Sequence, residues 1–401
     1  MGRTAEPSRA TFLRAVAAAA LGPAMGPVMG AADAAGGRIG GGAAGGSGRG
    51  DDRPDGAGPL VVTKVRDLTG PGLTTRFRME ATDLGIPVRV PDGRTLFVFG
   101  DTFEEARVGG GWWRSPVGLY STTARLEEGV VWSGAVGGEH ARQLWAYEHD
   151  NPLFTTVLPS DVVLVDGVLY LHVTVHRGWG GVLWSEIWRS DDSGANWRHT
   201  GARFPGNAHG GLFQLLTWEL GEDGHVYAYS TGFRRNGPVL LHRVRSNALA
   251  DPTAYEPWGH RDGAWAWGNA PTPVLEGGFG ELCLRRLDGR WLLVCFNAAE
   301  ARIEALVMDR PTADLTGVDR RTLIRDAPWG REDDTHVAQP YGGYVIPGSH
   351  LDDLHLTVSQ WRTGPEGWPY RVMQFRVRGL AASAASAASA ASDTSDTSGT
   401  S

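Results

Sequence analysis

Pairs of short apolar segments joined by a tight turn recur along this chain. Segments rich in β-branched and aromatic residues flank Asp92-Gly93, with IPVRV before it and TLFVF after it. Asp-Gly is a strong hairpin signal, because both central residues of a two-residue hairpin turn need a positive φ and this pair tolerates it. Similar turns, each followed by another apolar segment, are Asp166-Gly167, Asp223-Gly224, Asp288-Gly289 and Asp352-Asp353. The pattern predicts an all-β protein.

The spacing of these turns indicates how the strands are arranged. Successive turns lie 74, 57, 65 and 64 residues apart, with several short strands in each period. A near-regular period of this size, without a convincing amphipathic helix, is typical of four-stranded sheets repeated around an axis. We therefore predict a five-bladed β-propeller. A pair of β-sandwiches is the alternative, but it would not explain five similar turns.

The two ends of the chain differ in composition from its body. Residues 1–35 contain three arginines ahead of the apolar segment AVAAAALG and then small residues, which predicts an export signal. SRATFLR resembles a twin-arginine signal whose second arginine is alanine, so the export route stays open. Residues 36–58 predict a Gly/Ala-rich linker, residues 59–380 the propeller domain, and residues 381–401 a low-complexity tail. We expect a secreted protein without a membrane anchor.

Charge and composition limit the classes of partner and cofactor that this chain can bind. The net charge of −7 argues against nucleic acid or an anionic membrane, since both require a basic face. The 16 tryptophans serve either core packing or stacking on flat apolar faces such as sugar rings. No Cys/His spacing, calcium loop or phosphate-binding glycine motif occurs, so we expect no cofactor and no metal. A closed propeller needs no partner to cover its edges, which favours a monomer.

Two further motifs concern the fold. The segment SDDSGANW, residues 190–197, fits the Asp-box pattern S-x-D-x-G-x-x-W, which folds a hairpin between outer strands of a propeller blade. Cys283 and Cys295 flank the fourth turn almost symmetrically. In an exported protein they can form a disulfide, but direct cross-strand pairs often have poor geometry, so two buried thiols are the alternative.

Two aspartates stand at equal distances from the first turn. Asp83 lies nine residues before Asp92, and Asp101 lies nine residues after it. Folding the chain back at this turn places Asp83 and Asp101 side by side at the open end of one hairpin. Two adjacent carboxylates are the minimum equipment for cleaving a glycosidic bond. From geometry alone the alternative is that Asp83 caps a loop and Asp101 ends a strand.

The same segments carry a family likeness. TDLGIPV, LFVFGDTF, GELCLRRLDGRWLLVCF, YGGYVIPGS, LHLTVSQW and YRVMQF, spread over residues 75–378, resemble the DUF4185 family. That family resembles five-bladed propeller glycoside hydrolases. Members grouped as glycoside hydrolase family 183 are endo-D-arabinanases, which cut the D-arabinan of mycobacterial arabinogalactan and lipoarabinomannan with inversion. The resemblance implies that Asp83 of TDLG and Asp101 of GDTF are the catalytic pair.

In an inverting hydrolase one carboxyl group donates a proton to the leaving oxygen while the other takes a proton from water. Asp101 follows an apolar strand, and burial there would raise its pKa, so we assign it as the acid and Asp83 as the base. Direct cross-strand neighbours would be closer than the roughly 6.5–9.5 Å that inversion prefers. We therefore expect the strand ends to splay.

Other side chains are candidates for the same central channel. The predicted substrate-binding residues are Glu281, Gln214, Tyr341, Gln360 and Trp361. Each has an alternative role in the core or in holding blades together. His209 and His336 lie in predicted loops and are weaker candidates. Trp112-Trp113 follows GDTF closely and offers a stacking surface.

Two other functions remain open. The same fold can attack another furanoside such as L-arabinan, because a fold does not determine its substrate. A non-catalytic propeller that binds surface carbohydrate is the third possibility, with the aspartates acting only as hydrogen-bond acceptors.

Overall fold

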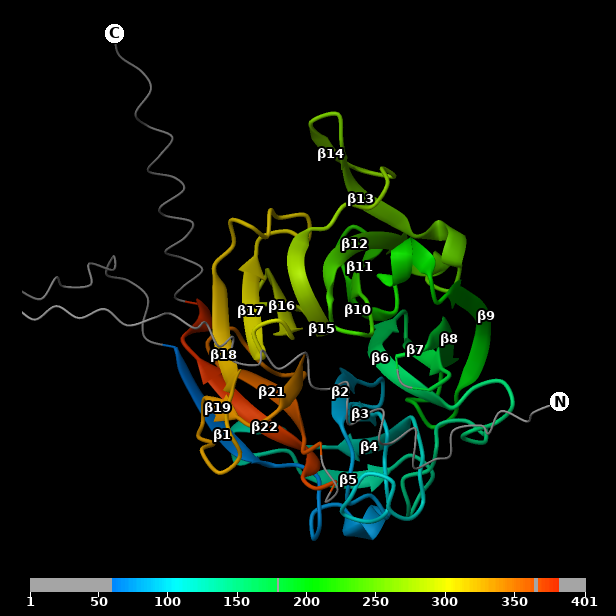
Figure 1. Cartoon of the computed structure of the whole chain (residues 1–401), viewed down its shortest axis with the longest axis vertical. Helices are drawn as coiled ribbons and strands as arrows, with labels where there is room; N and C mark the ends of the chain where they lie inside the picture. The colour runs from blue at the N-terminus through cyan, green and yellow to red at the C-terminus, as the bar shows by residue number, and fades with distance from the viewer. Residues whose placement is uncertain (1–59, 179, 364–366, 382–401) are drawn as a thin grey trace, which may run out of the picture.

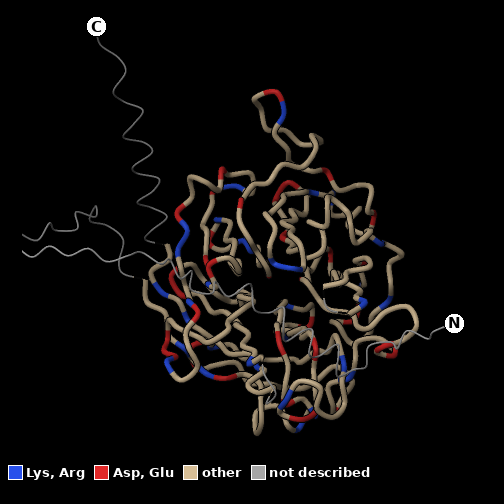
Figure 2. Tube along the Cα trace, in the orientation of Figure 1, with Lys and Arg blue, Asp and Glu red and all other residues tan. Residues whose placement is uncertain are grey.

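The computed structural model describes residues 60–178, 180–363 and 367–381 (Figure 1). The predicted export signal, the predicted linker and residues 382–401 of the predicted tail lie outside this range. The described residues form 22 β-strands and five 3₁₀ helices. No helix among them is long and apolar enough to cross a membrane. Basic and acidic residues are interspersed around the fold (Figure 2).

The strands form four sheets, three of them four-stranded. The first sheet contains β2 (Leu84–Arg89), β3 (Thr95–Phe99), β4 (Val117–Ser121) and β5 (Trp132–Ala135). The second contains β6 (Thr156–Val165), β7 (Val168–His176), β8 (Val182–Ser190) and β9 (Arg198–Pro205). The sheet formed from the two ends of the described chain contains β1 (Val61–Asp67), β22 (Tyr370–Arg378), β21 (Leu354–Trp361) and β20 (Pro340–Val345).

The remaining sheet has ten strands and contains two successive antiparallel meanders. Its first half consists of β10 (Leu215–Leu220), β11 (His225–Thr231), β12 (Gly237–Arg245), β13 (Glu256–Arg261) and β14 (Ala264–Trp267). Its second half consists of β15 (Leu275–Leu287), β16 (Arg290–Asn297), β17 (Arg302–Met308), β18 (Arg320–Asp326) and β19 (His336–Val337). The 3₁₀ helices are η1 (Thr75–Phe77), η2 (Leu126–Glu128), η3 (Ala208–Gly211), η4 (Ser246–Ala248) and η5 (Pro252–Ala254).

The innermost strands form a closed ring. β2 contacts β6, β6 contacts β10, β10 contacts β15, β15 contacts β20, and β20 returns to β2. The sheets therefore radiate from a common centre (Figure 1). β1 pairs antiparallel with β22, from Val61 opposite Arg378 to Asp67 opposite Met373, so the first and last strands complete one sheet together. The prediction of an all-β fold of several sheets is confirmed.

The predicted hairpins form, but not all by the predicted turn. Asp166-Gly167 and Asp288-Gly289 have a positive φ at both residues, as expected. At Asp92-Gly93 the expectation is wrong, because only Gly93 has a positive φ, of 86°. Pro91 precedes Asp92 and fixes its own φ near −65°, which suits the first central position of an ordinary β-turn. The Gly93 amide then donates to the Val90 carbonyl at 3.0 Å, which makes a longer loop.

The Asp-box forms the predicted hairpin, between β8 and β9. Asp192 Oδ1 accepts hydrogen bonds from the Asn196 amide at 2.9 Å and from Ser190 Oγ at 2.7 Å. Trp197 is buried and donates its indole N–H to the Gly194 carbonyl at 3.0 Å. The motif therefore closes a turn in the second sheet.

The two cysteines are free, buried thiols. Cys283 lies opposite Val294, and Cys295 lies opposite Leu282, so the pair is offset by one residue. Successive side chains of a strand point to opposite faces of the sheet. The two sulfur atoms accordingly belong to different core clusters, and the alternative of two thiols is the one observed.

A buried carboxylate connects three of the inner strands. Asp161 of β6 accepts hydrogen bonds from Thr217 Oγ1 at 2.6 Å and from the Trp218 amide at 2.8 Å, both in β10. Its two oxygens also accept from Arg285 of β15, at 2.8 and 3.0 Å. Asp161 is fully buried, and the Arg285 side chain is 13% exposed. The charges compensate each other and link β6, β10 and β15.

Replacing this cation should destabilise the ring. In Arg285→Met the Asp161 carboxylate stays buried without its charged partner, and we expect a loss of about 3–5 kcal/mol of unfolding free energy. Arg286→Met is the matched control, because Arg286 pairs with the exposed Glu222 and should cost less than about 1 kcal/mol. Urea unfolding of both variants measures the difference. Equal losses would show that the Asp161–Arg285 pair does not stabilise the ring.

Candidate active site

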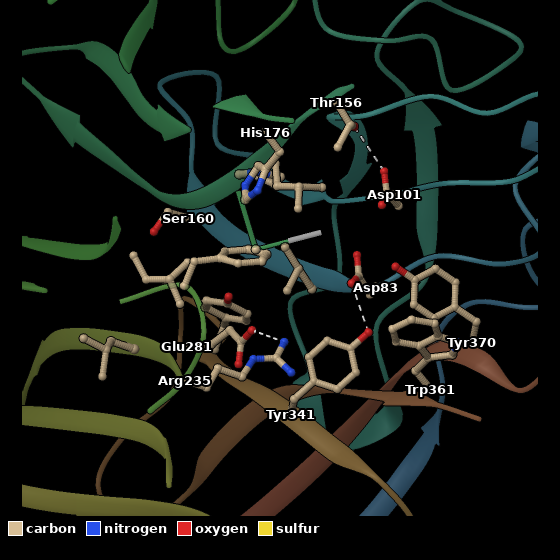
Figure 3. Close-up of a pocket in the computed structure, with 18 of the residues that line it drawn as sticks. Asp83, Asp101, Thr156, Ser160, His176, Arg235, Glu281, Tyr341, Trp361 and Tyr370 are labelled. Carbon is tan, nitrogen blue, oxygen red and sulfur yellow. Dashed lines mark hydrogen bonds and ion pairs between the residues drawn. The ribbon is translucent and has the colours of Figure 1, made fainter. Parts of the chain in front are cut away.

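A pocket opens at the centre of the ring, and every inner strand contributes to it (Figure 3). The lining includes Leu84 of β2, Leu158 of β6, Leu215 of β10, Leu282 of β15 and Tyr341 of β20. Segments far apart in the sequence meet there because the sheets radiate from one centre. Asp83 and Asp101 both line this pocket, as predicted for a pair at the open end of the first hairpin.

An irregularity in β2 directs Asp83. Leu84 lies opposite Phe99, but the register then shifts so that Ile86 lies opposite Val98. Leu84 and Gly85 both have a positive φ, of 67° and 71°. A positive φ is uncommon for a leucine, and such strain persists only where the surroundings enforce it. Here the Leu84 amide donates to Ser359 Oγ of β21 at 2.8 Å. A bulge of this kind re-aims the neighbouring side chain.

Gly100 leaves room for the Asp83 carboxyl group. The Gly100 amide donates to the Asp83 carbonyl at 3.3 Å, which holds the two chain segments together. A Cβ atom on Gly100 would collide with Asp83 Oδ1, because it would lie closer than any van der Waals contact allows. A side chain at this glycine of GDTF would therefore displace the Asp83 carboxyl group from its place beside Asp101.

Asp83 is held in a mostly apolar setting with little hydrogen bonding. Tyr341 Oη donates to Asp83 Oδ2 at 2.9 Å, whereas Oδ1 is buried and has no hydrogen-bond partner among the described residues. Burial, and then the charge of Asp101, raise the pKa of Asp83 to about 7, although the hydroxyls of Tyr370 and Tyr341 partly oppose the shift. This carboxyl group is therefore half protonated near neutral pH.

Asp101 has a different set of partners. Trp113 Nε1 donates to Asp101 Oδ1 at 2.7 Å, and Thr156 Oγ1 donates to the same oxygen at 3.4 Å. Burial raises the pKa of Asp101 to about 6, and these two donors limit the rise. Between about pH 6 and 7 such a pair shares about one proton. Burial raises the pKa of both groups, and that of Asp83 is the higher one, which is the reverse of the order on which the acid and base roles were assigned from the sequence.

Three of the predicted binding residues line the pocket: Glu281, Tyr341 and Trp361. Glu281 accepts a hydrogen bond from Arg235 Nη2 at 2.5 Å. Trp361 lies edge-on to Tyr370, with ring centroids 5.7 Å apart. Each of these side chains therefore lies close to the aspartate pair or to one of its contacts (Figure 3).

Gln214 and Gln360 are not among the described residues that line the pocket. Gln214 donates to the Gly206 carbonyl at 2.6 Å and accepts from the Phe233 amide at 3.0 Å, so it fastens two loops. Gln360 is fully buried, donates to the Ala338 carbonyl at 3.1 Å and accepts from Arg371 Nε at 3.0 Å. Both amide groups are used within the protein, which corresponds to the alternative of a structural role.

The weaker candidates also lie away from the pocket lining. His209 packs against His242, and His336 interacts with Asp333. Trp112 stacks on Arg114, whose guanidinium carbon is 4.1 Å from the ring centroid. Trp113 is buried and acts on Asp101 through its indole N–H, a role that the sequence did not indicate.

Several pocket residues were not predicted from the sequence, chiefly Arg235, His176, Tyr370, Thr156 and Phe233. Tyr370 begins YRVMQF, a segment of the family likeness, so its tyrosine was accessible to the same reasoning. Arg235 lies in the loop between β11 and β12, where an arginine is ordinarily solvated. Nothing local in the sequence placed it beside Glu281. Within the described ranges, no group of three or more His, Cys, Asp or Glu residues could hold a metal ion.

Removing the Asp83 charge should stabilise the folded protein. The folded-state pKa of about 7 exceeds the ordinary value of 3.8, so this group's stability contribution is lost as the pH rises from about 4 through 7. We expect Asp83→Asn to be more stable than wild type at pH 8, by on the order of 2 kcal/mol, and similar at pH 4. Thermal and urea unfolding at both pH values measure this.

The matched control is Asp262→Asn, since the Asp262 side chain is 89% exposed and lies in the turn between β13 and β14. Its stability should follow wild type at both pH values. An Asp83→Asn protein less stable than wild type at pH 8 would contradict the burial argument.

Comparisons with known proteins give the family. Residues 69–376 match the profile described as "Domain of unknown function (DUF4185)". The chain is 30% identical over 325 residues to an "Uncharacterized 35.9 kDa protein in asd 3'region" of Mycolicibacterium smegmatis, covering 77% of this chain and 95% of that protein. It is 29% identical over 327 residues to "Notoamide biosynthesis cluster protein J'" of Aspergillus versicolor, covering 73% and 84%.

At least one solved structure shares the fold with a TM-score above 0.5. A "putative hydrolase" from Bacteroides ovatus superimposes with a TM-score of 0.56 at 13% identity, covering 82% of this chain and 92% of that one. An arabinanase of Bacillus subtilis is more distant, with a TM-score of 0.45, 13% identity and coverages of 74% and 94%. Since the family profile spans most of the described domain, the chain belongs to the DUF4185 family.

Proposed function

We propose that this protein is a secreted, endo-acting glycoside hydrolase that cleaves D-arabinofuranosyl linkages in arabinan of the mycobacterial type. The observation that carries the proposal is the pair Asp83 and Asp101, two half-buried carboxyl groups in one pocket with pKa values of about 7 and about 6. Glycoside hydrolysis needs one protonated and one ionised carboxyl group at the same linkage. The likeness of the DUF4185 motifs to glycoside hydrolase family 183 supports D-arabinan as the substrate.

The architecture fits a five-bladed propeller. We group β10–β13 as one blade and β15–β18 as the next, because the ten-stranded sheet joins them only between β12 and β15, at Gly237 opposite Phe279 and Val239 opposite Leu275. Each of the other sheets is one blade. The ring of contacting inner strands supports this grouping.

The reaction proposed is hydrolysis with inversion. A water oxygen forms a bond to the anomeric carbon as the bond from that carbon to the leaving oxygen breaks. One aspartate takes a proton from the water, and the other gives its proton to the leaving oxygen. The order proposed is Asp101 as acid and Asp83 as base. Because the pKa of Asp83, about 7, exceeds that of Asp101, about 6, this order requires that substrate binding move the shared proton to Asp101. Glu281, Tyr341 and Trp361 would bind the sugar, by accepting or donating hydrogen bonds and by stacking.

Hydrolysis is tested by digesting mycobacterial arabinogalactan with the purified protein and following the products by chromatography. We expect a ladder of arabino-oligosaccharides, and a roughly 10²–10⁴-fold lower rate in Asp83→Asn and in Asp101→Asn, since each removes an acid or base. Asp262→Asn is the control and should match wild type. If only L-arabinan yields products, the substrate is L-arabinan and not D-arabinan. If the protein binds arabinan but releases no products, it is a carbohydrate-binding propeller.

The pH dependence should be bell-shaped, with a maximum between about pH 6 and 7. The pair titrates in two steps, near pH 6 and near pH 7. Below both steps the pair holds two protons and has no base, and above both it holds none and has no acid, whichever aspartate carries the single proton in between. Chemical rescue of the two variants would show which aspartate is the acid and which is the base. Azide should restore turnover in the variant that lacks the base, whereas an aryl arabinofuranoside with a good leaving group should restore it in the variant that lacks the acid.

Gly100→Ala should inactivate the protein without removing any catalytic group. The added methyl group displaces the Asp83 carboxyl, and a misplacement of about 1 Å costs about 100-fold in rate. Gly134→Ala is the matched control, because a Cβ there meets nothing within 4 Å in the described part of the chain. Unfolding midpoints establish that both variants fold. A fully active Gly100→Ala protein would show that Asp83 need not hold this position.

Export and the oligomeric state complete the proposal. Residues 1–35 direct the chain out of the cell, which is tested by locating the full-length protein in culture medium and sequencing its N-terminus. The closed ring supports a monomer, and light scattering of the purified protein tests that.

A further inference from the structure

The ion pair between Glu281 and Arg235 lies in the pocket beside the aspartates, and one carboxylate oxygen of Glu281 has no hydrogen-bond donor among the described residues. Glu281 of β15 is 6% exposed, and its Oε1 accepts from Arg235 Nη2 at 2.5 Å. Its other oxygen, Oε2, is buried and has no hydrogen-bond partner within the described ranges. A buried carboxylate oxygen without a donor is costly, so such atoms call for an explanation. A ligand that enters the pocket with a donor would supply the missing bond.

Arg235 is fixed in place by its surroundings. Its guanidinium carbon lies 4.9 Å from the ring centroid of Tyr341 and 5.6 Å from that of Phe296. Gly280 allows this approach, because a Cβ atom there would lie 2.9 Å from Arg235 Cγ. The arginine is therefore held between two aromatic rings with its charge directed at Glu281. It neutralises the carboxylate and fixes the carboxylate's orientation.

The ion pair is connected to the aspartate pair through Tyr341. The same phenol ring that stacks under Arg235 donates its hydroxyl to Asp83 Oδ2 (Figure 3). Asp83 Oδ1 is the second carboxyl oxygen of the pocket that is buried without a partner in the part of the chain that the structure describes. Both of these oxygens thus belong to one cavity, on either side of the tyrosine.

The chemistry of these atoms limits what can bind. An ionised carboxylate only accepts hydrogen bonds, so the ligand must bring donors. An anion would meet the carboxyl groups of Asp83, Asp101 and Glu281, and the positive charge of Arg235 is already paired with Glu281. An uncharged ligand with hydroxyl groups brings the required donors without that repulsion.

We propose that Glu281, positioned by Arg235, accepts a hydrogen bond from a free hydroxyl group of the sugar bound beside the aspartates and thereby selects unsubstituted chains. The inference rests on the proposed function for the identity of the ligand as a furanoside chain. A site built around a hydroxyl group rejects analogues that lack it, because its own buried polar atom is then left unpaired. Chains in which that hydroxyl is removed or substituted should bind about 100-fold more weakly.

The test uses binding in an Asp101→Asn background, so that turnover is not required. The probes are a D-arabinofuranosyl oligosaccharide and its monodeoxy analogues, each lacking one hydroxyl group, measured by calorimetry. We expect one deoxy analogue to lose about 100-fold in affinity with Glu281 present and to lose little once Glu281→Gln is added. Glu276→Gln is the matched control, because it makes the same change at an exposed position of the same strand.

Arg235 is tested as a positioning residue. Arg235→Lys keeps the charge but not the planar group between the two rings, so the selection against the deoxy analogue should weaken. Arg234→Lys, at the exposed neighbouring position, should leave it unchanged. If Arg235→Lys fails to fold, the double variant Arg235→Met with Glu281→Gln removes both charges of the ion pair and should fold while lacking the selection.

The outcomes separate the two proposals. If the deoxy analogue loses as much affinity in the Glu281→Gln variant as it does with Glu281 present, the role of Glu281 is overturned even if the wild type hydrolyses arabinan. Failure of all oligosaccharides to bind the folded Asp101→Asn protein overturns it as well. If wild type releases no products but the coupling between Glu281 and one hydroxyl is measured, hydroxyl recognition stands and hydrolysis is the proposal that fails.

Discussion

The closed ring of inner strands is the constraint on which the rest of the structure depends. Each inner strand contacts two others, and the sheet that contains β20 is complete only when β1 pairs with β22. The ends of the described chain must therefore meet before the ring is whole. Asp161 reinforces the ring from inside by bonding to β10 and to Arg285 of β15, where a buried charge is tolerated because it is fully paired.

The same closure creates the chemistry of the site. Inner strands that converge on one centre place their ends around a shared, partly enclosed pocket. Desolvation then acts on any carboxyl group located there, and it is the largest cause of the raised pKa values of Asp83 and Asp101. Asp161 and Asp83 illustrate the difference between structure and function. The first has donors on both oxygens, whereas the second retains one oxygen without a partner among the described residues.

Several residues around this pocket have an uncommon backbone conformation or a buried polar atom without a hydrogen bond from the described chain. Leu84 adopts a positive φ next to Asp83, and Glu281 Oε2 and Asp83 Oδ1 are buried without donors from the described chain. Proteins tend to retain such features where they serve binding or catalysis, while the surrounding structure supplies the stability. Gly100 and Gly280 contribute through the side chain they lack, since a methyl group at either would collide with a pocket side chain.

The sequence by itself determined the strands, the hairpins and the meeting of Asp83 with Asp101, because alternation, turn residues and a short hairpin are local properties of the chain. It also indicated Glu281, Tyr341 and Trp361, which lie on strands of the repeated pattern. Only the tertiary structure decided that Arg235 pairs with Glu281 and that the Trp113 indole donates to Asp101. It also decided that the side chains of Gln214 and Gln360 bond to backbone carbonyl groups and not to a ligand. Those contacts join loops and strands that are separated in sequence, and they depend on the ring closure that brings the sheets to one centre.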